Sequence, residues 1–68
     1  LKQVFALTDR EAEVLVWIAK GKSNRDVAAI LGCSPRTINK HLEQIYHKLD
    51  VENRTSAAMR AIQVVSES

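Results

Sequence analysis

The residues best suited to bind a partner are cations and small polar side chains in the middle of the chain. Between Lys20 and Lys48 there are six basic and two acidic residues, so this stretch carries a net charge of +4 in a chain whose total is +2. This distribution favours a surface that faces a polyanion and is built from one contiguous part of the chain. The alternative is that the charges are scattered over a solvated surface and have no partner.

Residues for covalent or metal chemistry are few. Cys33 is the one cysteine, so it predicts no internal disulfide and no cysteine-based zinc site, and it points to a reducing compartment, the cytoplasm. A nucleophile and base formed by Cys33 and His41 is disfavoured, because eight residues separate them and no orienting carboxylate or oxyanion loop is evident. We therefore expect no enzyme, no cofactor and no metal, and a small apolar role for Cys33.

The length and composition set the organisation of the chain. With 68 residues, of which 46% are hydrophobic and 26% charged, the sequence predicts one folded domain over residues 1–68. No apolar run approaches the roughly 18 residues that a membrane span requires. The first residue is Leu1 rather than a methionine, and we expect the chain to be a piece of a longer protein.

Cap residues predict an all-α fold. Four helices are expected, at roughly 9–20, 24–31, 35–49 and 54–65. Residues that favour a helix start precede each of them: Thr8, with Glu11 completing a capping box, then Ser23, Ser34-Pro35 and Asn53. Gly21 and Gly32 are expected to end the first and second helices in a left-handed conformation.

Apolar spacing predicts which side of each helix faces the core. The first helix is expected to bury Val14, Leu15 and Ile18. The second is expected to bury Val27, Ala28, Ile30 and Leu31. The third is expected to bury Ile38, Leu42, Ile45 and Leu49. The fourth is expected to bury Ala57, Ala58, Ala61 and Ile62, with Met59 and Gln63 facing outward.

The second and third helices are expected to form a helical hairpin. Ala28 and Gly32 are small enough to let the two helices cross steeply, a spacing shared with the helix-turn-helix motif. The outer face of the third helix is predicted to carry Arg36, Lys40, Glu43 and His47. A helix presented in this way fits the major groove of DNA, so geometry and charge agree.

A family resemblance extends from Leu7 to about Ala61 and rests on many residues in order. They are Leu7, Thr8, Arg10, Glu11, Glu13, Val14, Leu15, Ala19, Gly21, Lys22, Ser23, Asn24, Ala28, Leu31, Gly32, Ser34, Thr37, Ile38, His41, Leu42, Lys48, Leu49, Val51, Arg54 and Ala57. This pattern resembles the LuxR/FixJ/NarL/GerE-type DNA-binding domain of bacterial transcription regulators. The resemblance implies a four-helix domain with its third helix in the major groove, its fourth helix at a dimer contact, and a separate N-terminal regulatory domain.

The resemblance also implies roles for individual positions. The predicted base-contacting residues are Asn39, Lys40 and Glu43. The predicted phosphate-contacting residues are Lys22, Ser23, Asn24, Arg36, Thr37 and Lys48. The predicted dimer contact is formed by Met59 and Gln63. The family often has a basic residue at the positions of Asn39 and Glu43. The operator sequence that a relative binds is therefore not expected to apply to this chain.

The chemistry of three side chains refines these roles. The Asn39 amide is expected to read adenine with two hydrogen bonds, and the Lys40 ammonium is expected to reach guanine. Glu43 has two interpretations that stay open. It either accepts a hydrogen bond from a cytosine amino group or pairs with Lys40 or His47 at helical spacing.

The function that we predict is sequence-specific binding of double-stranded DNA, as a weak two-fold dimer on paired half-sites. One alternative is a helical interaction module that docks on RNA polymerase through its basic face. Another is the promoter-reading domain of a sigma factor, against which the segments 8–13 and 48–51 argue.

Overall fold

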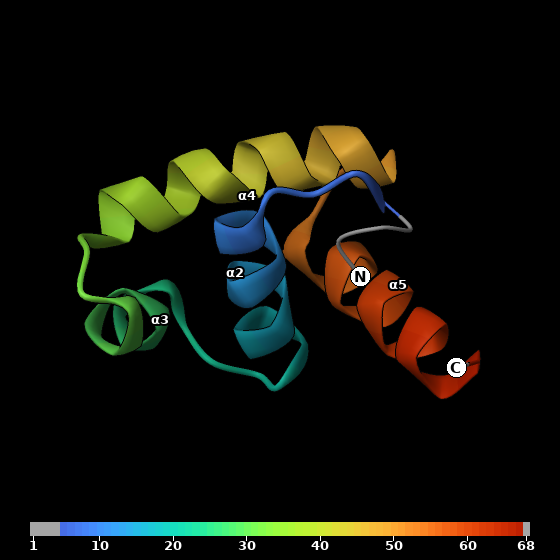
Figure 1. Ribbon diagram of the computed structural model, residues 1–68, viewed down its shortest axis with the longest axis horizontal. Helices are drawn as coiled ribbons and strands as arrows, with labels where there is room; N and C mark the ends of the chain where they lie inside the picture. The colour runs from blue at the N-terminus through green and yellow to red at the C-terminus, as the bar shows by residue number, and fades with distance from the viewer. Residues whose placement is uncertain (1–4, 68) are drawn as a thin grey trace.

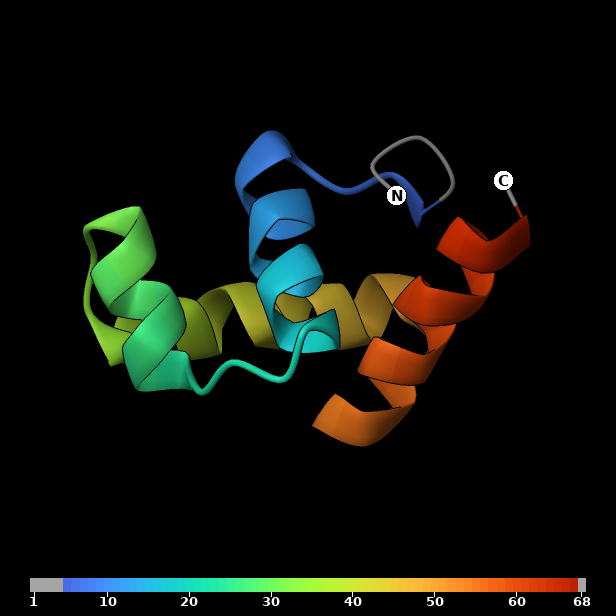
Figure 2. The same cartoon turned by 90° about the horizontal axis from the view of Figure 1, so that it is seen from below.

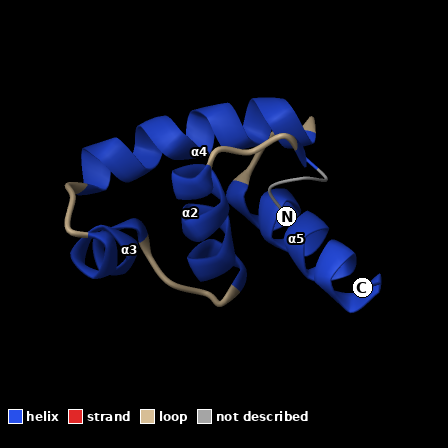
Figure 3. Cartoon of the chain, viewed as in Figure 1, coloured by secondary structure: helices blue, strands red, loops and turns tan. Residues whose placement is uncertain are grey.

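Four α-helices make up the chain between residues 9 and 67. The computed structural model describes residues 5–67, with side chains as far as residue 64. The helices are α2 (Asp9–Ala19), α3 (Asn24–Leu31), α4 (Pro35–Leu49) and α5 (Arg54–Glu67). No strand occurs within the described range (Figure 3). The predicted all-α fold is confirmed, and its limits change little: α2 ends at Ala19 with Lys20 as its C-cap, and α5 continues to Glu67.

The predicted caps begin the helices. The Glu11 amide donates to the Thr8 hydroxyl at 3.2 Å, and the Thr8 amide donates to the Glu11 carboxylate at 2.9 Å, which completes the capping box. The hydroxyls of Ser23 and Ser34 each accept from the backbone amide three residues later, both at 3.2 Å. The Asn53 side chain accepts from the backbone amide of residue 56 at 2.8 Å. These caps are local, which is why spacing along the chain could predict them.

Helix α2 lies at the centre of the arrangement. Helix α4 runs along the length of the molecule, with α3 beside its first half and α5 near its end, and α2 crosses it between them (Figures 1 and 2). Helix α2 contacts all three other helices. The buried apolar side chains form one core: Leu7, Val14, Leu15, Ile18, Val27, Ala28, Ile38, Leu42, Ile45, Leu49, Ala57 and Ala61. This packing fixes the direction in which α4 presents its outer face.

Two isoleucines depart from the predicted core. Ile30 and Ile62 were expected to face inward, but 47% of Ile30 and 52% of Ile62 is exposed. Both predictions were wrong for the same reason: α3 and α5 lie at the two ends of the arrangement, where α2 and α4 are their neighbours, so an apolar residue beside the buried stripe stays in solvent (Figure 1). Ile62 directly follows the buried Ala61, and the helical turn of about 100° per residue carries it out of the interface.

Candidate nucleic-acid interface

The turn between α3 and α4 brings the two helices together over three residues. Gly32 has a φ of +72°, and its amide donates to the Ala28 carbonyl as α3 ends. The Cys33 amide donates to the same carbonyl at 2.9 Å. Ser34 then caps α4, and Pro35 is the first helical residue. Cys33 is half-buried against the core, as predicted for a small apolar residue in a turn.

Helix α4 has one buried face and one polar face. The predicted stripe of Ile38, Leu42, Ile45 and Leu49 is buried, which confirms that part of the sequence analysis. The side chains that project outward are all exposed: Arg36, Asn39, Lys40, Glu43, Gln44 and His47. The polar face is therefore held in place by the core, and it is available to a partner along the length of the helix.

The three residues expected to contact bases lie together on this outer face. Lys40 directly follows Asn39, and Glu43 lies four positions after Asn39. This spacing places the three side chains on adjoining parts of the helix surface. Over the range that the structure describes, the side chains of Lys40 and Glu43 have no hydrogen-bond or ion-pair partner. The interpretation in which Glu43 pairs with Lys40 or His47 is thus not realised in this structure.

Most of the residues expected to contact phosphates gather at the starts of α3 and α4. Lys22, Ser23 and Arg36 are exposed, whereas Asn24 and Thr37 are half-buried. The Ser34 and Thr37 hydroxyls lie 3.1 Å apart. Helix N-termini attract anions because their free amides and the helix dipole are positive there, and the neighbouring cations add to this attraction.

A chain of hydrogen bonds links the start of α5 to the outer face of α4. The Arg54 guanidinium donates from Nη1 to Asn24 Oδ1 and from Nη2 to the Lys22 carbonyl. Asn24 Nδ2 in turn donates to Asn39 Oδ1 at 2.7 Å. We call Arg54, Asn24 and Asn39 the amide relay. Sequence analysis gave Arg54 no role, because residues 30 and 15 positions apart are brought together only by the fold.

Burial also affects the ionisation of a tyrosine beside this relay. It raises the pKa of the Tyr46 phenol, and the positive charge of Arg54 opposes that rise. The phenol is accordingly neutral near pH 7, and it adds no charge to the interface.

Lys48 lies in a different environment from the other cations. Its ammonium donates to Glu11 Oε1 at 2.7 Å, and 29% of its side chain is exposed. Glu11 is only 5% exposed. Burial by itself raises the pKa of this carboxyl, but the Lys48 ammonium and the Thr8 amide outweigh it, so the pKa of Glu11 lies below its ordinary value. Lys48 thus has a structural partner that spacing along the sequence did not reveal.

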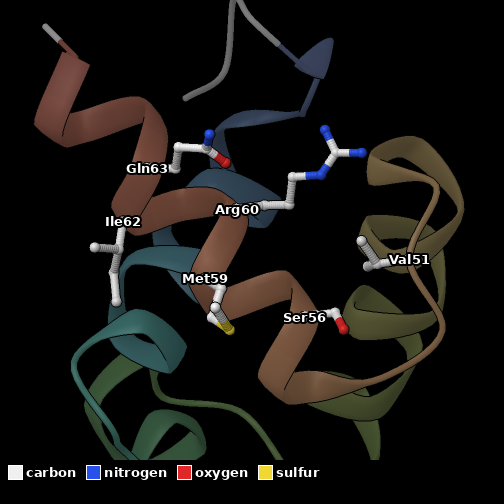
Figure 4. Close-up of a pocket in the computed structure, with 6 residues that line it drawn as sticks. All are labelled: Val51, Ser56, Met59, Arg60, Ile62 and Gln63. Carbon is white, nitrogen blue, oxygen red and sulfur yellow. The ribbon is translucent and has the colours of Figure 1, made fainter.

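The predicted dimer residues border an open groove on α5. The groove is lined by Val51, Ser56, Met59, Arg60, Ile62 and Gln63 (Figure 4). Met59 is 65% exposed, and Ile62 adds a second exposed apolar side chain to the same helix. The apolar part of this surface is consequently larger than the sequence indicated.

Residues 5–67 offer neither a metal site nor a membrane span. They contain no group of three or more His, Cys, Asp or Glu side chains that could hold a metal ion. No helix among them is long and apolar enough to cross a membrane.

Comparison with known proteins agrees with this arrangement. The family described as "Bacterial regulatory proteins, luxR family" (GerE) matches residues 6–61. The transcriptional activator protein AnoR of Acinetobacter nosocomialis is 48% identical over 56 residues, which are 82% of this chain and 24% of AnoR. The transcriptional activator protein LuxR of Aliivibrio fischeri is 46% identical over 82% of this chain and 22% of its own length.

A third relative shows the same pattern. The transcriptional regulatory protein YhcZ of Bacillus subtilis is 43% identical over 61 residues, 90% of this chain and 28% of YhcZ. The chain spans less than a third of the length of these relatives. Family membership confirms that the chain is no enzyme and disfavours the sigma-factor alternative. The chain is a helix-turn-helix DNA-binding domain that belongs to the luxR family of bacterial regulatory proteins.

Proposed function

We propose that the chain binds double-stranded DNA in a sequence-dependent manner, with the outer face of α4 in the major groove. The observation that carries this proposal is the position of Asn39, Lys40 and Glu43. They lie exposed on one face of a helix whose opposite face is fixed by the core. Amide, ammonium and carboxylate groups can each distinguish base edges in the major groove. Relatives named as transcriptional activators are consistent with this role.

Attachment to the backbone is assigned to the starts of the two hairpin helices. Lys22, Ser23 and Asn24 would contact phosphates at the start of α3, and Arg36 and Thr37 would do so at the start of α4. Asn24 would use the second hydrogen of its Nδ2, because its oxygen and its other hydrogen are bonded to Arg54 and Asn39. Lys48 was predicted to act in the same way, but its bond to Glu11 makes it the weakest of these candidates. The net charge of +4 between Lys20 and Lys48 can neutralise about four phosphates. This gives a slope of about −3.6 in a plot of log affinity against log salt concentration, and about twice that for a dimer.

Pairing through α5 completes the proposal. Met59 and Gln63, together with Ile62, would meet the same residues of a second copy when two chains occupy adjacent half-sites. One short helix offers a small area, so we expect a weak dimer that forms on DNA. Because the curated relatives are much longer than this chain, we also propose that it acts as the output domain of a longer cytoplasmic regulator, with its signal sensed elsewhere.

Selection of bound sites from random duplex DNA tests the proposal. The wild-type chain should enrich one half-site, and Lys40→Ala should lose the preference at one base position. Arg10→Ala is the matched control, because Arg10 is an exposed cation outside the proposed interface, 3.7 Å from Glu13. It should keep the wild-type preference. Failure to retain any duplex at low salt, combined with capture of RNA polymerase, would favour the protein-docking alternative.

A further inference from the structure

The hydrogen bonds of the amide relay run in one direction, from donor to acceptor, and Arg54 sets that direction. Arginine carries five N–H donors and no acceptor, so the atom of Asn24 that faces Arg54 must be the oxygen Oδ1. The other end of the Asn24 amide, Nδ2, then faces Asn39. Because Nδ2 only donates, the atom of Asn39 that meets it must be Oδ1, at 2.7 Å.

The direction of the relay decides what Asn39 presents to a partner. One of the two lone pairs of its oxygen accepts from Asn24, whereas the hydrogens of its Nδ2 have no partner among the residues that the structure describes. An asparagine that reads adenine with two bonds turns both its oxygen and an N–H toward the base, whereas the Asn39 oxygen is held toward Asn24. Guanine instead presents two acceptors, N7 and O6, in the major groove, and a side chain that only donates matches that edge.

We propose that Arg54 and Asn24 act as positioning residues that hold the Asn39 oxygen toward Asn24 and leave its Nδ2 for the base, so that Asn39 reads as a donor and prefers guanine. The inference rests on the proposed function, because it assumes that Asn39 faces a base. It also revises the expectation from sequence that Asn39 reads adenine. Arg54 would influence base choice without touching DNA, through one intervening side chain.

Reversing the direction of the relay gives the sharpest test. Asn24→Asp keeps the size of the side chain but offers oxygen at both ends. The new carboxylate accepts from Arg54 as the amide did, and it now requires a donor from Asn39, which must turn its amide and expose Oδ1. The preferred base should change from guanine to adenine or cytosine, the bases with an amino group in the major groove, by about tenfold in relative affinity.

Two further variants separate this effect from charge and from folding. Asn53→Asp makes the same chemical change next to Arg54 and retains the cap of α5, so it should lower affinity for all duplexes while the preference for guanine stays. Arg54→Lys retains a donor-only side chain and should keep the preference. Arg54→Gln offers both a donor and an acceptor and should reduce the preference for guanine over the other bases. Circular dichroism verifies the helical content of each variant.

The experiment is site selection followed by affinity measurements on duplexes that differ at one base. A wild-type preference for guanine that Asn24→Asp reverses, and that Asn53→Asp leaves unchanged, supports the relay. A wild-type preference for adenine at this position, or a guanine preference that Asn24→Asp leaves intact, overturns the relay while DNA binding stands. A wild-type chain that shows no base preference at all overturns the proposed function and, with it, the relay.

Discussion

Glu11 has a second role beside the capping box that was predicted for it. Its carboxylate completes the capping box at Thr8 and also accepts from Lys48, 37 residues away. A buried carboxylate requires partners for its charge, and removal of one partner costs more than the pair itself contributes. The pair therefore connects the start of α2 to the end of α4, the helix that we propose enters the major groove of DNA.

Substitution of Lys48 should reveal this structural role. Lys48→Met removes the ammonium and leaves Glu11 buried without its counter-charge, so the free energy of unfolding should fall by about 1–3 kcal/mol. The double variant Glu11→Gln with Lys48→Met should recover part of that loss. Denaturant unfolding of the four chains of this cycle measures the coupling. Equal stability of Lys48→Met and wild type would show that the pair is a surface contact of no consequence.

The same pair makes stability depend on pH. The pKa of Glu11 is lower in the folded chain than its ordinary value of 4.5, so the stabilisation is present above pH 4.5 and disappears as the pH falls through the lowered pKa. Glu11→Gln should flatten the loss of stability in that acidic range. Glu13→Gln is the control, because Glu13 forms only an exposed ion pair with Arg10, and its curve should follow wild type. Unfolding followed by circular dichroism from about pH 7 to about pH 3 makes the comparison, and parallel curves for all three chains would contradict the assignment.

At the scale of the elements, the end of α4 contains a strained residue. Asp50 has a φ of +56° in the left-handed region, where a residue with a Cβ is disfavoured. Its negative charge also lies at the end of a helix where the dipole favours cations. Glycine adopts this conformation without strain, as Gly32 does at the end of α3.

Asp50→Gly should therefore stabilise the chain by about 0.5–1 kcal/mol, visible as a higher melting temperature. Asp50→Ala removes the same charge from the end of the helix but keeps a Cβ. It therefore separates the effect of the helix dipole from that of the backbone strain, and it should raise the melting temperature little or not at all. A larger gain from alanine than from glycine would show that charge, rather than conformation, limits stability at this position.

The elements were predictable where the signal is local. Thr8, Ser23 and Ser34 cap helices through residues three positions away, and the buried stripe of α4 follows helical spacing. Contacts between distant segments were not predictable. Arg54 meets Asn24 and Lys48 meets Glu11 only because α2 packs against α3, α4 and α5 and brings their ends together. Ile30 and Ile62 were misplaced for a related reason, since spacing does not tell how much of a helix its neighbours cover.

At the scale of the whole molecule, binding to DNA and pairing of two chains are expected to be coupled. Met59 and Ile62 expose apolar surface on α5, the helix at the opposite end of the molecule from the α3–α4 turn (Figure 1). Such an area is small for a stable dimer, so the free chain should be largely monomeric at micromolar concentration. Two half-sites on one duplex would hold two copies close enough for this weak contact to form.

Met59→Asp should weaken cooperative binding to paired half-sites more than binding to a single half-site. An acidic side chain in the contact repels its copy and is costly to bury, whereas α4 remains unchanged. Gel-shift titrations of one-site and two-site duplexes measure both affinities. Sedimentation is the second readout, and a tight dimer that survives Met59→Asp would place the contact on another surface.

The affinity of the chain for its selected duplex, relative to a scrambled duplex of equal length at the same salt concentration, reports whether α4 reads base sequence. Wild type should bind the selected duplex at least about 10³-fold more tightly. Lys40→Ala should lose on the order of 1–3 kcal/mol on the selected duplex and little on the scrambled one, while Arg10→Ala keeps the full ratio. Equal affinity of the wild-type chain for the two duplexes, or an equal loss on both with Lys40→Ala, would show that α4 does not read base sequence.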